Sequence, residues 1–240
     1  MTARTYLLCH AHPDDETLAT GAIALGLRAR GDAVVVLTAS RGERGEVRPG
    51  PFALLAGTPQ LAAIRDKELA TAVAALGIEH HSYLGTPPAR AEGLRPRRYT
   101  DSGMRWVTPT LAGPGEDAGP ESLTAADLDE VTADIAAFAR ATQTTDLVSY
   151  DDDGSYGHPD HIRMHDATRA AARLLGLPFH VIVTDPTGLY DEWLDATSEA
   201  EALNSAYDAY KTQFVREGDE VTHVGGQDDR VVRAAGLRLA

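Results

Sequence analysis

Two short clusters of histidine and carboxylate side chains, far apart in the chain, have the composition of a catalytic metal site. The first is His-Pro-Asp-Asp-Glu at residues 12–16, which is separated by two residues from the apolar run at 6–9. The second is Tyr-Gly-His-Pro-Asp-His at residues 156–161, where an extended run passes into a predicted helix. Imidazole nitrogens and carboxylate oxygens are the ligands that catalytic divalent metals take from proteins. The two clusters therefore predict one metal site built from both halves of the chain.

The spacing within each cluster suggests a division of roles. Asp14 and Asp15 are adjacent, so their side chains diverge on any regular backbone, and one can bind a metal while the other faces a substrate. The second cluster has the pattern of a helix start, with His158 at the cap and Asp160 in the first turn. His158 and His161 are then neighbours on one helix face. One ring can bind the metal while the other, oriented by Asp160, stabilises an oxyanion or protonates a leaving group. Two histidines and one carboxylate leave a metal position open for water, which suits hydrolysis.

Other arrangements of the histidines are less favoured. His10 alternates with His12 as in a strand and could chelate beside it, but a strand histidine is more often packed or hydrogen-bonded. His161 and His165 have the spacing of a helical zinc pair, yet Ile162 stands where the glutamate base of that motif belongs. Alone, residues 14–16 would also fit a helix cap. The recurrence of the pattern in a second cluster favours the metal site.

The elements that must position these clusters follow from the periodicity of the sequence. Short apolar runs alternate with longer Ala- and Leu-rich stretches of helical period, which predicts an α/β fold built around a parallel sheet. The predicted strands are 5–9, 33–39, 80–84, 146–150 and 178–183, and the predicted helices are 16–29, 59–76, 125–141, 158–175 and 199–216. Both clusters and two long polar loops, 41–58 and 85–123, follow strands. Ligands bind beyond the carboxyl ends of strands in open parallel sheets, so we expect these loops to carry binding residues.

Composition limits the function classes. The chain of 240 residues is 43% hydrophobic, enough for a full-sized core, and we expect a single domain over residues 1–240. The net charge of -14 repels phosphate backbones, so we do not expect a nucleic-acid partner. The first apolar run is too short for a signal peptide or a membrane span, and we expect a cytoplasmic protein that binds no membrane. The lone Cys9 excludes an internal disulfide, and no glycine-rich phosphate loop follows the first strand.

The two clusters resemble those of the LmbE/PIG-L family of metal-dependent N-deacetylases, which act on N-acetylglucosamine conjugates in mycothiol, bacillithiol and glycosylphosphatidylinositol synthesis. Weaker matches are Arg-Gly-Glu at 41–43, Arg-x-x-Glu-Leu at 65–69 and Asp-Ser-Gly-Met at 101–104. The last is most similar to the mycothiol branch. The resemblance implies a Rossmann-like, mostly parallel sheet flanked by helices. Residues 217–240 lie outside it, as a C-terminal extension.

The resemblance also implies roles for individual residues. The expected ligands of Zn2+ or Fe2+ are His12, Asp15 and His161. The expected catalytic residues are Asp14, His158, Asp160 and Tyr156. The expected substrate-binding residues are Arg65, Glu43, Asp101, Ser102 and Met104. In this scheme Asp14 is the general base, His158 stabilises the oxyanion with Asp160 as its orienting partner, and Tyr156 reaches the tetrahedral intermediate.

Three functions are compatible with this interpretation. The leading hypothesis is a zinc-dependent hydrolase that removes an acetyl group from the N-acetylglucosamine moiety of a small polar conjugate. The second is an amidase or natural-product tailoring deacetylase that acts on a larger acylated aminosugar. The third is a non-catalytic, metal-containing sugar-binding protein. The expected partner is a small aminosugar conjugate, and the oligomeric state stays open, a homo-oligomer included.

Overall fold

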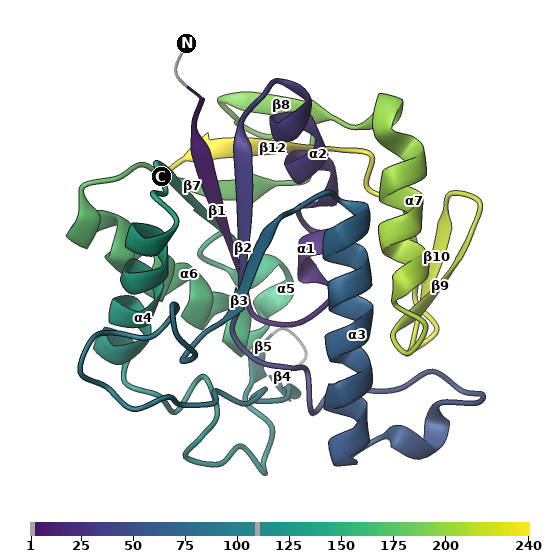
Figure 1. Ribbon diagram of the computed structural model, residues 1–240. Coiled ribbons are helices and arrows are strands. Elements are labelled where there is room, and N and C mark those ends of the chain that lie inside the picture. The colour runs from purple at the N-terminus through teal and green to yellow at the C-terminus, as the bar shows by residue number, and fades with distance from the viewer. Residues whose placement is uncertain (1–2, 109–110) are drawn as a thin grey trace.

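A seven-stranded sheet forms the centre of the computed structural model, which describes residues 3–108 and 111–240 (Figure 1). The strand order is β3-β2-β1-β6-β7-β12-β8. The five strands from β3 to β7 are parallel, and β12 and β8 extend the sheet in antiparallel pairs. The mostly parallel α/β fold is confirmed. Its strands are β1 (Thr5–His10), β2 (Ala33–Thr38), β3 (His80–Tyr83), β6 (Asp146–Ser149), β7 (Phe179–Val183), β8 (Glu192–Asp195) and β12 (Ala234–Leu239).

Helices cover both faces of this sheet. On one face α4 (Leu128–Ala141) packs on α6 (Pro159–Leu175), and α6 contacts β6, β1 and β7. On the other face lie α2 (Gly21–Ala29), α3 (Pro59–Ala75) and α7 (Ala200–Ala209), with α3 packed along α7 (Figure 1). The short elements are α1 (Asp15–Leu18), α5 (Gly154–Gly157), η1 (Ala53–Leu55) and η2 (Thr197–Glu199). The result is a three-layer arrangement in which both faces of the sheet are buried.

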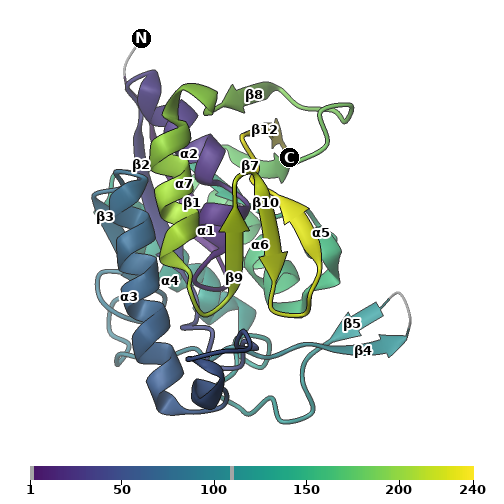
Figure 2. The same ribbon diagram turned by 90° about the vertical axis from the view of Figure 1, so that its right-hand side faces the viewer.

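Two small antiparallel units lie outside the main sheet. One is the pair β4 (Arg105–Thr108) and β5 (Leu111–Gly113), which projects from the body of the molecule (Figure 2). The other comprises β9 (Phe214–Glu217), β10 (Glu220–His223) and β11 (Asp228–Arg230), with β9 in contact with α7. Their strands are short, and β11 is wholly exposed, so they lack the long apolar runs by which sequence analysis finds strands.

Two predicted helices differ from the structure. The helix expected over 16–29 is divided into α1 and α2, because Thr20 has φ −128° and its hydroxyl donates to the Glu16 carbonyl. The helix expected over 199–216 ends at Ala209. Tyr210 leaves the helical conformation with φ −88° and ψ 67°, which carries its ring into the core, and Phe214–Glu217 form strand β9.

The central strands form the core. Five of the six residues of β1 are buried, and Leu7 and Leu8 have no exposed surface. Cys9 is buried among them. Parallel strands that are covered by helices on both faces have continuous apolar sequences. The apolar runs of the sequence therefore predicted the positions of these strands well.

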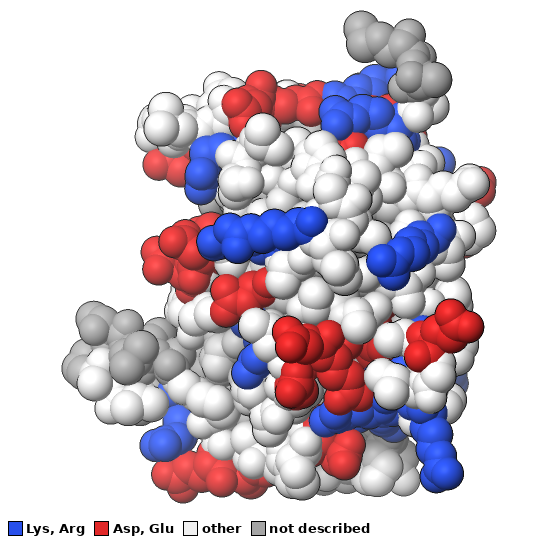
Figure 3. Space-filling view, turned by 90° about the vertical axis from the view of Figure 1, so that its left-hand side faces the viewer, with Lys and Arg blue, Asp and Glu red and all other residues white. Residues whose placement is uncertain are grey.

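On the face covered by α4 and α6, acidic and basic side chains are interspersed with uncharged ones (Figure 3). Within 3–108 and 111–240, no helix combines the length and apolar character needed to cross a membrane.

The order of the strands fixes where a ligand site can form. From β1 the chain passes to β2 and β3 on one side, and later returns to β6 on the other side of β1. The loops that leave β1 and β6 therefore diverge, and the carboxyl ends of two such strands are where open parallel sheets bind ligands. Both His-Pro-Asp clusters lie in or just after those loops.

We predict that Leu7→Ala lowers the free energy of unfolding by about 3–5 kcal/mol, because it removes a fully buried side chain from the central strand. Leu54→Ala, at a leucine that is 91% exposed, is the matched control and should change stability by less than about 0.5 kcal/mol. Chemical denaturation followed by circular dichroism measures both. Equal losses for the two variants would contradict the assignment of the core.

Candidate metal centre

The loop after β1 presents its two aspartates in different directions. Asp14 has φ 105°, a backbone conformation that residues with a side chain rarely adopt. Its N–H donates to Glu16 Oε2 over 3.1 Å, and its carboxylate accepts a hydrogen bond from Arg65. Asp15 turns the other way, and its Oδ2 accepts the His12 N–H over 2.8 Å. The turn thus directs the two carboxylates to different partners, Asp14 to Arg65 and Asp15 to His12.

The second cluster forms the start of α6. His158 is the N-cap, and its Nδ1 accepts the N–H of Asp160 over 3.2 Å. The preceding segment, α5, packs directly against this helix. Gly154 has φ 63°, and a Cβ there would lie 3.0 Å from the Ile162 nitrogen. Only glycine lets the chain approach α6 so closely at this turn.

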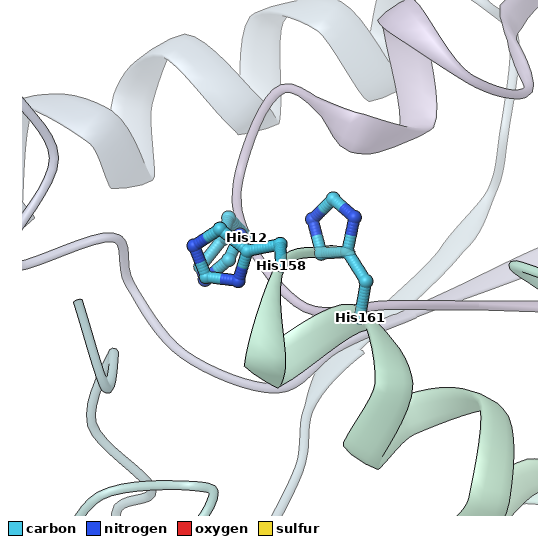
Figure 4. A group of neighbouring side chains, drawn as sticks. All are labelled: His12, His158 and His161. Carbon is cyan, nitrogen blue, oxygen red and sulfur yellow. The ribbon is translucent and has the colours of Figure 1, made fainter. Parts of the chain in front are cut away.

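Three histidine rings converge at this junction. Ligand atoms of His12, His158 and His161 lie within 4.8 Å of one another, and all three residues are buried (Figure 4). The carboxylate of Asp15 adjoins two of them, with Oδ1 3.4 Å from His161 Nε2 and Oδ2 3.6 Å from His12 Nδ1. Neither ring nitrogen of His161 has a hydrogen-bond partner in the described part of the chain. Buried nitrogens without partners beside a carboxylate fit a divalent metal.

Hydrogen bonding distinguishes the three rings. Since Nδ1 of His158 accepts a backbone N–H, the proton of its neutral ring sits on Nε2, which makes that atom a donor and not a ligand. Nε2 of His12 faces the Asp160 carboxylate at 3.2 Å and must carry its proton there, so the lone pair of His12 is on Nδ1, toward Asp15. The donors left for a metal are His12, Asp15 and His161.

Protonation states agree with this division. Burial lowers the pKa of His161 to about 4, so its lone pair is free at neutral pH. Burial and the neighbouring His12 ring lower the pKa of His158 to about 2, so that ring stays neutral. Burial alone would raise the pKa of Asp15, but the His161 and His12 rings outweigh it and hold this pKa well below its usual range. A charged carboxylate beside the neutral His161 ring suits a divalent cation. Burial lowers the pKa of His12, but Asp101, Asp15 and Asp160 raise it well above its usual value, so a metal would displace a proton from that ring.

Asp160 has a different partner from the one expected. Its carboxylate Oδ2 contacts His12 Nε2 and accepts the N–H of Ser102 over 2.9 Å, while only its backbone N–H meets His158. His158 uses Nδ1 to cap the helix, so only its Nε2–H can donate, and that group makes no hydrogen bond to the Asp160 carboxylate in the described part of the chain. Asp160 therefore orients His12 instead of His158, as a carboxylate placed behind an expected metal ligand.

Arg65 is buried and supports the loop after β1. Its side chain is 3% exposed and donates to Asp14 Oδ2 over 2.9 Å, to the Gly42 carbonyl over 3.0 Å and to the Pro13 carbonyl. A Cβ at Gly42 would collide with the guanidinium, so glycine is needed for this contact. The expected contact of Arg65 with a sugar does not fit this placement. Burial raises the pKa of Asp14 to about 8, although Arg65 opposes the shift.

Most of the other expected substrate-binding residues brace the loop 85–123. Glu43 accepts two hydrogen bonds from Arg98 and the N–H of Asp101. Asp101 is buried, with Oδ1 3.6 Å from His12 Nε2, and Ser102 is buried and accepts the Thr124 N–H. Side-chain surface is available at the remaining residue, Met104, which is 37% exposed, and at Tyr156, an expected catalytic residue that is 56% exposed. The ring of Tyr156 lies 5.3 Å from that of His161 and 5.9 Å from that of His158.

Sequence reasoning missed two buried tyrosines at this site. Tyr150 follows β6 directly, and its hydroxyl donates to Asp15 Oδ2. Tyr210 follows α7, and its hydroxyl donates over 2.7 Å to Glu16, whose other oxygen accepts the Asp14 N–H. The place of Tyr150 at the carboxyl end of a predicted strand was a usable signal. Nothing in the sequence pattern links Tyr210 to Glu16 across 194 positions.

Comparison with known proteins gives concordant matches. The PIG-L family, described as GlcNAc-PI de-N-acetylase, matches residues 7–172. A 1D-myo-inositol 2-acetamido-2-deoxy-alpha-D-glucopyranoside deacetylase of Kineococcus radiotolerans is 46% identical over 69% of this chain and 44% of its own length. One of Catenulispora acidiphila is 36% identical over 96% of this chain and 68% of its own length. The chain thus spans less than half of the first relative and about two thirds of the second.

Solved structures share the fold at low identity. A deacetylase of the teicoplanin biosynthesis pathway has a TM-score of 0.58 at 20% identity and covers 86% of this chain and 84% of its own. GalB, the 4-carboxy-2-hydroxymuconate hydratase of Pseudomonas putida KT2440, has a TM-score of 0.60 at 18% identity and covers 99% of this chain and 96% of its own. At these identities the likeness establishes the architecture alone.

We predict that Arg65→Ala lowers the free energy of unfolding by about 3–5 kcal/mol, because it leaves the carboxylate of Asp14 and two carbonyls without their buried partner. In an Asp14→Asn background the same substitution should cost less, since the ion pair is already absent. Arg105→Ala, at an exposed arginine paired with Glu116, should cost less than about 1 kcal/mol. Urea denaturation of the four variants and the wild type gives the coupling, and a coupling of zero would refute the pairing.

Proposed function

Because the chain belongs to the PIG-L family, we propose that it is a metal-dependent deacetylase that removes the N-acetyl group from an N-acetylglucosamine-containing small-molecule conjugate. The observation that carries this proposal is the convergence of His12, Asp15 and His161 beside the partly exposed carboxylate of Asp14. The names of the curated relatives make the inositol-linked conjugate the first substrate to test.

The donor set fits a divalent cation held by His12, Asp15 and His161. Zn2+ and Fe2+ both accept two imidazoles and one carboxylate, so availability in the cell would decide between them. Such an ion supplies Lewis acidity, which lowers the pKa of water and polarises an amide carbonyl. The remaining work of amide hydrolysis falls to side chains around the ion.

Asp14 is placed to move the proton. Its side chain retains 16% exposure beside the buried ligands, and Arg65 holds its orientation. Its pKa of about 8 lies close to neutral pH, where a general base both accepts and returns a proton effectively. In the proposed reaction Asp14 takes a proton from the attacking water and gives it to the departing amine.

His158 is placed to stabilise the oxyanion. Its Nδ1 is occupied by the helix cap, so Nε2–H is a fixed donor, and the neutral ring offers this hydrogen bond without a protonation step. Tyr156, at the rim of the site, adds a hydroxyl on the side of His158 and His161. Both donors would act on the carbonyl oxygen of the acetyl group as its negative charge develops.

The first prediction of this proposal separates the two aspartates. Asp14→Asn should retain a metal and lose turnover, whereas Asp15→Ala should lose the metal. Amine release from N-acetylglucosamine conjugates, including the inositol-linked one and larger acylated aminosugars, is measured with an amine-reactive fluorophore, and metal content by atomic emission. Wild-type turnover by Asp14→Asn would refute the base assignment. No release from any conjugate by the metal-loaded wild type would refute the deacetylase.

The second prediction concerns His158. His158→Ala should lower kcat by about 100- to 1000-fold and change KM little, because a donor to the oxyanion strengthens its hydrogen bond only in the transition state. Steady-state kinetics on the best conjugate measure both constants, with metal content as the control. An unchanged kcat with a raised KM would show that His158 binds the ground state instead.

A further inference from the structure

Tyr150 touches both Asp15 and His161, two of the three side chains left as metal donors. Its hydroxyl lies 2.7 Å from Asp15 Oδ2. Its ring stacks on that of His161, with centroids 4.0 Å apart and planes inclined by 6°. The residue is 1% exposed, so it cannot meet a substrate directly. Whatever it contributes must act through the two neighbours that it holds.

The partners of the Tyr150 hydroxyl determine which group donates in each of its hydrogen bonds. The Tyr150 oxygen accepts the N–H of Ala11 over 2.9 Å, and a backbone N–H can only donate. The phenolic proton is therefore free for Asp15 Oδ2, which also accepts the His12 N–H. Two short hydrogen bonds occupy Oδ2, while Oδ1 faces His161 Nε2. The two oxygens of Asp15 thus differ: hydrogen bonds from the protein fix Oδ2, and Oδ1 stays open to the site.

The backbone of Tyr150 is fixed as well. Its carbonyl accepts a hydrogen bond over 2.8 Å from Nδ1 of His165, one turn beyond His161 on α6. Tyr150 is therefore joined to the β1 loop through Ala11 and Asp15, and to α6 through His161 and His165. These are the two segments whose relative position sets the distance between the expected ligands.

On these contacts, and resting on the metal site of the proposed function, we propose that Tyr150 is a positioning residue that makes Asp15 a single-oxygen metal ligand and fixes the plane of the His161 ring. Its phenol competes with the metal for Oδ2 and leaves Oδ1 as the ligand atom. Partners of this kind, behind the ligands of a metal, typically change metal affinity or activity about 10- to 100-fold when they are removed.

The test is Tyr150→Phe, which keeps the stacked ring and removes only the hydroxyl. Zinc affinity is measured by competition with a chromophoric chelator, and the coordination geometry by the visible spectrum of the cobalt-substituted protein. We expect zinc affinity to fall about 10- to 100-fold and the cobalt bands to shift as Oδ2 becomes free to bind. Neither readout depends on turnover, so the inference is judged separately from the proposed deacetylase activity.

Tyr207→Phe is the matched control. Tyr207 is also 1% exposed and its hydroxyl also accepts a backbone N–H, that of Val232, but its ring packs against Phe214 of β9. This variant should keep wild-type zinc affinity and the wild-type cobalt spectrum. Thermal unfolding of the metal-free proteins shows what each lost hydroxyl costs in stability alone.

A second measurement covers a Tyr150→Phe protein that proves too unstable to titrate. The rise in the unfolding midpoint on addition of saturating zinc reports zinc binding without a titration, and it should be smaller for Tyr150→Phe than for the wild type and Tyr207→Phe. Wild-type zinc affinity and an unchanged cobalt spectrum in Tyr150→Phe would overturn the inference. Equal weakening by Tyr207→Phe, or an equal zinc-induced rise of the unfolding midpoint in Tyr150→Phe and the wild type, would also overturn it. Tight zinc binding without amine release from any conjugate would refute the deacetylase and leave the role of Tyr150 intact.

Discussion

The carboxylate of Asp15 is the group on which the rest of the site depends. It is buried, it accepts hydrogen bonds from His12 and Tyr150, and it faces His161 from the opposite half of the chain. A buried carboxylate is costly unless it is paired. Here backbone, phenol and imidazole groups share that stabilisation, and each one also fixes a part of the site. A divalent cation would complete the set.

The neighbouring Asp14 shows how the fold supports the proposed base in a strained position. Its positive φ persists because Arg65 and Glu16 bind its carboxylate and its N–H, and Tyr210 in turn binds Glu16. Strain of this kind is kept where the surroundings determine the conformation. Tyr210 lies beyond the residues that match the PIG-L family, so the C-terminal part of the chain contributes to the support of the proposed base.

The architecture alone does not select a reaction. A hydratase and a teicoplanin-pathway deacetylase both share this fold, at 18% and 20% identity. What the fold supplies is the point where the loops after β1 and β6 diverge, and many chemistries can use such a point. The proposal of N-deacetylation rests on the paired clusters and the family match, since both concern the residues in these loops.

The sequence by itself determined the α/β class, the position of the five parallel strands, and the two clusters that supply His12, Asp15 and His161. These features are local: buried strands are apolar runs, and each cluster is contiguous. Tertiary structure alone decided that Asp160 orients His12, that Arg65 faces Asp14 instead of solvent, and that Tyr150 and Tyr210 reach the β1 loop. Each of these contacts joins residues dozens to nearly two hundred positions apart. The direction of a side chain across such a distance depends on packing between layers, which periodicity and spacing do not encode.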